Sequence, residues 1–406
     1  MSEQEYGRLN GQPPVPEPET ASEINTHYGT PETADCSTDT IPKGTQPDAE
    51  KKKILVPDLV SMWKYMLAKG MGNQRLALYS YLNRALRSGE LSKVVGFRVK
   101  NRTINRAACE LKGVDFWKID RESFYANVRV HLTLQSDEGD QTWDGYLCCC
   151  CTFTNLDFSC IVEELTDTPW QDEEEFDRLN PYLVPYYTNK RVEEIAEQLW
   201  VRYGMPEALT DPKKRDAVEL ARRMGLTIIS QPIYGHQGVN SILFFAEGEI
   251  KTGEDRIERH KDGTRKHIKT EKPETITIPA NTIVINTNRI TCDFSRFNVL
   301  HECVHYELHY MFFRLQQMCS NDVRQIRTIE IEPEEGKRYS DPVYFMEKQA
   351  DRGAYALLMP AGHTRKTIFE ESSQIRECKN EGDRYQTIGL HIADELNLPH
   401  FRVRAR

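Results

Sequence analysis

The chain has 406 residues, of which 39% are hydrophobic and 28% are charged, and its formal net charge is -9. This length suggests two or three domains, and the composition excludes a wholly disordered chain and a fibrous repeat. No apolar run is long enough to cross a bilayer, the first residues lack the pattern of a signal peptide, and 11 cysteines, four of them consecutive, do not suit a disulfide framework. We therefore expect a cytoplasmic protein that makes no membrane contact.

Residues 1–50 are expected to form a disordered acidic tail. They hold ten acidic residues but only two basic ones, Arg8 and Lys43, and almost no bulky apolar side chains. Such a segment cannot bury enough apolar surface to offset the entropy lost on ordering.

Residues 51–120 carry the opposite charge, with fifteen lysines and arginines against five acids. Apolar side chains recur every three or four positions through 55–90, so we interpret 51–120 as a basic helical part. Its interspersed cations and aromatic rings, such as Arg98 and Trp117, could contact nucleic acid weakly. A simpler interpretation is a helical segment with its basic side chains in water and its rings in a core, because no defined DNA-binding motif is present.

An antiparallel meander is expected next, over 121–165, because apolar and polar residues alternate through three segments, 125–134, 146–154 and 158–164. Cys148 to Cys151 lie in the middle segment. Alternation sends two thiols to each face, so they cannot all bind one metal, and we interpret them as small buried side chains. The acidic, proline-containing segment 166–187 is expected to be a linker that ends a separate α+β domain, 51–187, of unknown role.

The remaining chain, 188–406, mixes expected helices and strands. Helical spacing marks 192–200 and 217–224, and short apolar runs predict strands at 226–229, 241–245 and 282–285. Between the last two strands, the charged insert 251–272 is expected to be an exposed hairpin or a mobile loop.

One motif in this part carries chemistry. The sequence His301-Glu302-Cys303-Val304-His305 is an H-E-x-x-H pattern inside a segment of helical apolar spacing. On a helix the two imidazoles lie one turn apart on one face, where both can bind a single Zn²⁺ ion. Glu302 beside them can act as a general base toward a zinc-activated water. The alternative is a pair of ordinary helical histidines.

A third ligand is expected from the helix that precedes Pro360. Glu347, Ala350, Asp351 and Ala354 share one face of this helix, and the small alanines would allow a close approach to the histidine helix. Glu347 could then complete a two-histidine, one-glutamate site. Asp351 could accept a hydrogen bond from the second nitrogen of a ligand histidine, or it could be a solvated acid.

His309 follows the motif but does not extend it. Eight residues after His301, on a continuous helix, its side chain would point about 80° away from the ligand face. We interpret His309 as structural, or as a residue behind a ligand.

Two stretches resemble the ImmA/IrrE family of metallo-endopeptidases: Ile283–Asn286 with Arg296–His309, and Glu347–Asp351 with Ala354 and Leu357–Pro360. The resemblance covers about half the chain. It implies a small zincin-like (gluzincin) α+β domain in which a short sheet packs on the H-E-x-x-H helix and a glutamate-bearing helix. It also implies His301, His305 and Glu347 as zinc ligands and Glu302 as the base.

The chain departs from the family pattern in two places. Cys303 and Val304 stand where small residues and glycine are common, and the gap before Glu347 is lengthened by the charged stretch 321–338, which we expect to be a loop beside the cleft. Neither departure removes a catalytic group. The last residues, 388–406, resemble the helical region that follows the family's peptidase core, with a helix-turn-helix-like pattern at 392–397.

The resemblance implies a regulatory zinc endopeptidase that cleaves a repressor-type DNA-binding protein in mobile-element control or a stress response. Two alternatives are a DNA-associated regulator with a structural or silent metal site and a non-enzymatic interaction module on the same fold. A purely structural site would not need the non-ligating Glu302, which favours the enzyme. Tyr344, Tyr355 and His363 are candidate oxyanion stabilisers, although packing or surface roles explain them more simply.

Overall fold

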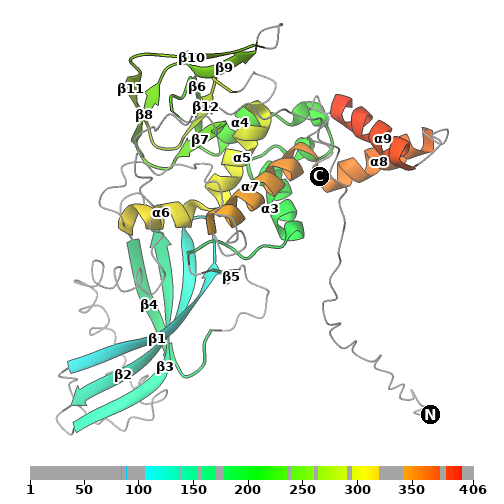
Figure 1. The fold of residues 1–406 in the computed structure, drawn as a ribbon. Helices are drawn as coiled ribbons and strands as arrows, with labels where there is room; N and C mark the ends of the chain where they lie inside the picture. Colours follow the sequence, from blue (N-terminus) through cyan, green and yellow to red (C-terminus); the bar gives the residue numbers. More distant parts are fainter. Residues whose placement is uncertain are drawn as a thin grey trace, which may run out of the picture. The chain divides into compact units, whose positions relative to one another are not determined.

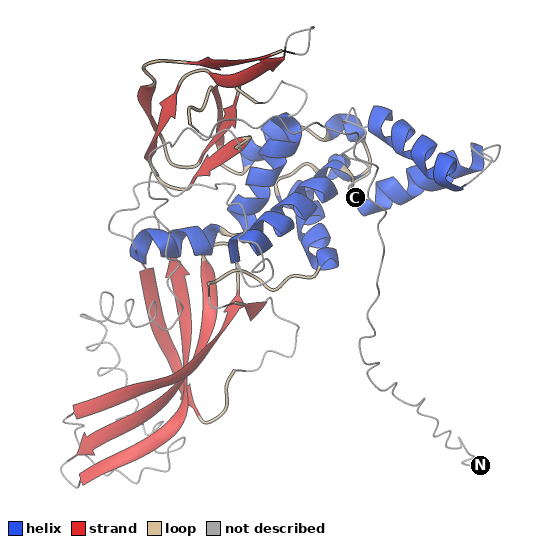
Figure 2. Cartoon of the chain, in the orientation of Figure 1, coloured by secondary structure: helices blue, strands red, loops and turns tan. Residues whose placement is uncertain are grey.

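The computed structural model shows a mixed fold of helices and small sheets (Figures 1 and 2). No helix in the part of the chain it describes combines the length and the apolar character that crossing a membrane requires. The described residues are 84, 88, 106–136, 139–153, 158–170, 178–180, 182–235, 239–259, 264–289, 295–319, 342–374 and 381–395. The expected acidic tail 1–50, nearly all of the basic segment before 106 and the stretch 321–338 lie outside these residues.

The first sheet has the strand order β4-β3-β2-β1-β5. Its bounds are β1 Arg106–Lys118, β2 Ser123–Ser136, β3 Gly139–Phe153, β4 Phe158–Thr166 and β5 Arg178–Leu179. Neighbouring strands are antiparallel, which confirms the predicted meander. Every second residue of β2 from Phe124 to Leu132 is at most 3% exposed, because alternate side chains of a strand point to the same face.

The prediction of a basic helical part over 51–120 is wrong for its last segment. Residues 106–118 form β1, which pairs with β2 along its whole length. Val114 and Phe116 point to the core as alternate residues of that strand, a period of two that the basic composition concealed. Arg84 and Ser88, the only earlier residues described, are helical.

The segment expected to be a linker also contributes to the fold. Within 166–187, β5 pairs with β1, and Leu183, Val184 and Tyr187 are buried in the main hydrophobic core. Described residues on both sides of the expected boundary at 187/188 belong to this one core.

The four consecutive cysteines follow the alternation of β3. Cys149 and Cys151 belong to the main core, while Cys148 is buried on the opposite face and Cys150 is half-buried there. All four are free thiols, as the interpretation of small, mostly buried side chains requires.

A second sheet, ordered β6-β12-β7, supports the helix that carries the motif. Its bounds are β6 Thr227–Gln231, β7 Ser241–Phe244 and β12 Thr282–Asn286, close to the predicted strands. The central strand β12 is buried throughout, parallel to β6 and antiparallel to β7. Outside it, β8 Gly248–Thr252 pairs with β11 Glu274–Ile278, and β9 Asp255–Arg259 pairs with β10 Arg265–Lys269. The insert 251–272 is therefore a hairpin.

The helices α3 Asn189–Arg202 and α4 Ala217–Arg223 match their predicted positions. Thr188 and Asp216 begin them by accepting hydrogen bonds from backbone amides of the first turns. Gly225, at φ +83°, follows the end of α4, where a left-handed residue suits glycine. Two short 3-10 helices, Pro206–Leu209 and Pro212–Lys214, connect α3 to α4.

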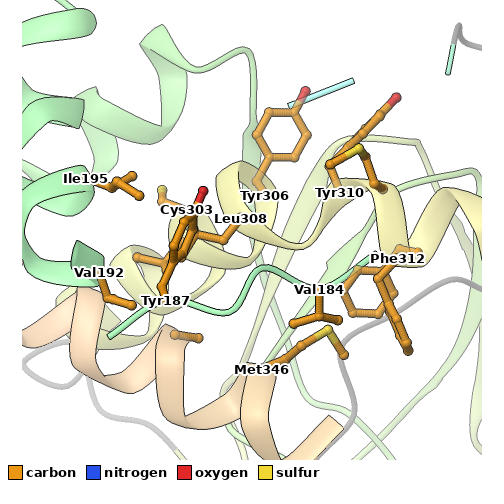
Figure 3. Close-up of a cluster of buried hydrophobic side chains, with 14 of the residues drawn as sticks. Val184, Tyr187, Val192, Ile195, Cys303, Tyr306, Leu308, Tyr310, Phe312 and Met346 are labelled. Atoms are coloured by element: carbon orange, nitrogen blue, oxygen red, sulfur yellow. The ribbon is translucent and has the colours of Figure 1, made fainter. Parts of the chain in front are cut away.

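The remaining helices are α5 Ser295–Leu308, α6 Tyr310–Cys319, α7 Pro342–Leu358, α8 Ala361–Gln374 and α9 Glu381–Glu395. Helices α3, α5 and α7 pack together (Figure 1). Figure 3 shows apolar side chains of α3, α5, α6, α7 and the segment before α3 gathered in one cluster. Ala350 and Ala354 are fully buried, as the expected close approach of α7 to α5 requires.

Contacts also join the first sheet to α5. Lys118, at the end of β1, donates from Nζ to the backbone oxygen of Glu307 at 2.9 Å and is only 7% exposed. The guanidinium of Arg121 lies 4.4 Å from the centre of the Tyr306 ring. The end of α5 that carries His305 is therefore held partly by residues of the first sheet.

Candidate metal centre

The two histidines of the motif lie one turn apart on α5, and their rings meet edge to face, with 4.7 Å between centroids. His305 is fully buried, whereas the side chain of His301 is 13% exposed. Phe297, one turn before His301, packs on its ring at 6.1 Å between centroids. Phe297 thus packs on one side of His301, whose side chain keeps a small exposed area.

Glu347 of α7 completes a compact group. His301 Nε2 and His305 Nε2 are 3.1 Å apart, and the two Glu347 oxygens lie 3.2 Å from His301 Nε2 and 3.3 Å from His305 Nε2. Among the described residues, this is the one group of at least three histidine, cysteine, aspartate or glutamate side chains whose ligand atoms lie within 4.8 Å of one another. The group can hold a metal ion.

The outer nitrogens of both rings have partners as well. Asp351 Oδ1 lies 3.1 Å from His301 Nδ1, and His309 Nδ1 lies 3.0 Å from His305 Nδ1. With a proton on each Nδ1, both Nε2 lone pairs point toward Glu347. Two such nitrogens and the two Glu347 oxygens, so close together, repel one another unless a cation lies between them.

The charges of these groups depend on one another. Burial opposes the charge on Glu347, but the facing His305 and His301 outweigh it and hold the pKa of this carboxyl well below its usual value. Burial likewise opposes a charge on His301, but hydrogen bonds to Asp351 and Glu347 raise the pKa of this ring well above its usual value. A bound metal ion would replace that stabilised proton, since metal ligation requires the neutral ring.

Glu302, the expected base, is 2% exposed and faces the second sheet. Ser241 at the start of β7 donates from Oγ to Glu302 Oε1 at 2.6 Å, a short hydrogen bond to a carboxylate. The sequence did not reveal this partner, because the two residues are 61 positions apart.

His309 lies between two elements rather than on a continuous helix. Helix α5 ends at Leu308 and α6 begins at Tyr310. His309 Nε2 lies 2.9 Å from Gln349 Oε1, a partner that the sequence analysis missed. Burial and the neighbouring His305 lower the pKa of His309 well below its usual value.

The three candidate oxyanion stabilisers occupy different surroundings. Tyr355 packs on Phe297 at 4.9 Å between ring centres, Tyr344 stacks under Lys348 Nζ at 5.4 Å, and His363 lies on α8. The packing partner of Tyr355, Phe297, also packs on a proposed ligand, His301.

No protein-family model matches the chain, and no curated protein sequence matches it. The functional assignment therefore depends on the side chains of the metal centre themselves.

Proposed function

We propose that this protein is a zinc-dependent endopeptidase of the ImmA/IrrE type that hydrolyses a specific protein substrate. The observation that carries the proposal is the meeting of His301, His305 and Glu347, with Glu302 next to the first ligand on the same helix. The motif supplies two of these ligands and the base, and α7 supplies the third.

The spacing of the ligand atoms supports zinc. Two ligands bound at about 2.0–2.1 Å in tetrahedral geometry lie roughly 3.3 Å apart. Here the two Nε2 atoms are 3.1 Å apart, and each lies 3.2 or 3.3 Å from a different oxygen of Glu347. Two histidines and one glutamate form a donor set of catalytic zinc sites, which keep a fourth position for water or substrate. The 25% exposure of the Glu347 side chain provides access from solvent.

Zinc held by these residues would polarise the scissile carbonyl and lower the pKa of a water to about 7. Glu302 accepts a proton from the attacking water and returns it to the leaving amine nitrogen. Ser241 fixes the carboxylate of Glu302 through Oε1. Asp351 keeps His301 in the tautomer whose Nε2 lone pair faces the site.

The proposed substrate is a repressor-type transcriptional regulator, and the support for it is the resemblance of the motif-bearing segments to ImmA/IrrE peptidases. The test is co-expression of the chain with the repressor encoded nearest to its gene. We expect the unsubstituted chain to contain one zinc ion and to cleave the repressor. Glu302→Gln should retain zinc but lose cleavage, because the amide cannot accept the proton.

A matched control is available on the same helix. Glu307 is 5% exposed and pairs with Arg202 away from the ligand atoms. Glu307→Gln should therefore retain both zinc and cleavage. Cleavage that survives in Glu302→Gln, or an unsubstituted chain that binds no zinc, would refute the proposed function.

A further inference from the structure

A buried chain of hydrogen bonds leads from His305 away from the metal centre. His305 Nδ1 lies 3.0 Å from His309 Nδ1, and His309 Nε2 lies 2.9 Å from Gln349 Oε1. Gln349 Nε2 in turn donates to the backbone oxygen of Pro185 at 2.8 Å. His305 and His309 are fully buried and Gln349 is 4% exposed, so these groups satisfy one another inside the protein.

The direction of every bond in this chain follows from its last member. A backbone oxygen can only accept, so the amide nitrogen of Gln349 faces Pro185 and the amide oxygen faces His309. That oxygen also can only accept, so His309 carries its proton on Nε2. The ring of His309 is fully buried between an imidazole and an amide, surroundings that favour its neutral form. A neutral ring has a single N–H, so His309 Nδ1 is an acceptor.

The tautomer of His309 in turn sets that of the proposed ligand His305. Because His309 Nδ1 accepts, His305 must donate from Nδ1, and in the neutral ring its Nε2 then keeps a lone pair. This Nε2 is the atom that faces His301 and Glu347. The chain thus selects, for a neutral His305, the tautomer whose Nε2 can bind a metal.

We propose that Gln349 and His309 are positioning residues of the metal centre, through which the backbone oxygen of Pro185 sets the tautomer and orientation of His305. The inference rests on the proposed function, because it takes His305 as a metal ligand. Pro185 lies in the segment after β5, outside the helices that carry the motif. This segment would therefore also help to position the site.

The two histidine ligands are thus oriented in different ways. His301 uses the carboxylate of Asp351, whose side chain is 47% exposed. His305 lies deeper, and the groups on its outer side form a neutral chain that ends on the backbone. A neutral chain avoids burying a second carboxylate behind the ligand, which would carry a desolvation cost.

The first experiment measures zinc affinity by competition with a chromophoric chelator. Gln349→Met and His309→Phe remove the chain while keeping similar side-chain volumes. We expect each to weaken zinc binding about 10- to 100-fold, the usual effect of removing a partner behind a ligand. His309→Asn places an amide oxygen where Nδ1 stood, so it should bind zinc more tightly than His309→Phe.

A matched control separates positioning from general stability. Trp200 Nε1 also donates to a backbone oxygen across the core, that of Leu357 in α7, at 3.2 Å, but its bond leads to no ligand. Trp200→Phe should lower stability and leave zinc affinity unchanged. Circular dichroism of each metal-free variant checks folding. If His309→Phe does not fold, the zinc affinities of Gln349→Met and His309→Asn still test the inference.

The second experiment reads the tautomers directly, by ¹⁵N NMR of histidine-labelled, metal-free full-length protein. We expect His309 to carry its proton on Nε2 and His305 to carry a proton on Nδ1, the nitrogen that faces His309. In Gln349→Met, His309 should no longer be held in one tautomer. A proton on His309 Nδ1, or folded variants with unchanged zinc affinity, would overturn the inference. If the unsubstituted chain binds zinc in that case, the proposed function still stands; if it binds none, the proposed function fails as well.

Discussion

Val304 of α5 packs directly on the backbone of Gly353 in α7, so closely that a β-carbon at position 353 would lie 2.7 Å from Val304 Cγ2. Side-chain carbons are essentially never found at that separation. The bulk of this valine between the two histidines is thus matched by a glycine on the facing helix. Because α5 carries His301 and His305 and α7 carries Glu347, this contact helps to set the spacing of the ligand atoms.

Gly353→Ala should therefore destabilise the protein. Alanine gains about 0.5–1 kcal/mol of helix propensity over glycine, but overpacking a core costs typically about 1–3 kcal/mol. We expect a net loss of unfolding free energy, measured by urea denaturation of the metal-free protein, together with weaker zinc binding. The double variant Val304→Ala, Gly353→Ala should recover both properties relative to Gly353→Ala. If Gly353→Ala is as stable as the parent chain, the two helices do not pack in this way.

Local periodicity explains which parts of the fold could be predicted. The long alternation of β2 and the helical spacing of α5 and α7 each identify one element with one buried face. Strand β1 was misassigned, because its lysines and arginine continue the basic composition of the preceding segment.

For the candidate site, the motif identified the residues that the structure brings together, but not the partners behind them. Ser241 meets Glu302, and Gln349 meets both His309 and Pro185, only through tertiary packing, across 40 to 164 residues of sequence. The 80° estimate for His309 assumed a continuous helix, whereas α5 ends just before it. Such pairings depend on how separate elements pack, which no local spacing reports.

Lys118 gives a test of the contact between the first sheet and α5. Its Nζ donates to the Glu307 backbone oxygen near the carboxyl end of α5, where the helix dipole also stabilises a cation. Lys118→Met should lower the unfolding free energy by about 1–3 kcal/mol, the cost of leaving a buried acceptor without its partner. Urea denaturation followed by circular dichroism measures the change.

A control for this variant lies on the same strand. Lys112 pairs with Glu110 at 2.6 Å, but both side chains are exposed, at 41% and 65%. Lys112→Met should change stability by less than about 1 kcal/mol, because exposed ion pairs contribute little. Equal effects of the two substitutions would show that the Lys118 contact does not stabilise the protein.

The thiol of Cys148 should be unreactive near neutral pH. Burial raises the pKa of Cys148 to about 11. Because the thiolate is the nucleophile, its reaction with iodoacetamide should be slow at pH 7 and should accelerate as the pH rises toward this value. Mass spectrometry of alkylated peptides measures the rate. In denaturant, where burial is lost, Cys148 should react readily at pH 7 to 9; equally fast labelling of the native chain would contradict its burial.

Ser241 gives the sharpest test of the role of Glu302. Its hydroxyl is 2.6 Å from Glu302 Oε1, and both side chains are buried. Hydrogen bonds to charged groups contribute about 1.5–3 kcal/mol, so Ser241→Ala should slow repressor cleavage roughly 10- to 100-fold if Ser241 holds the base in position. The loss should appear in kcat with KM unchanged, because the hydroxyl fixes a group that acts in the chemical step. Ser241→Thr retains the hydroxyl and should restore most of the rate, while zinc content should be equal in all three proteins. A Ser241→Ala variant that cleaves at the parent rate would show that β7 does not position Glu302.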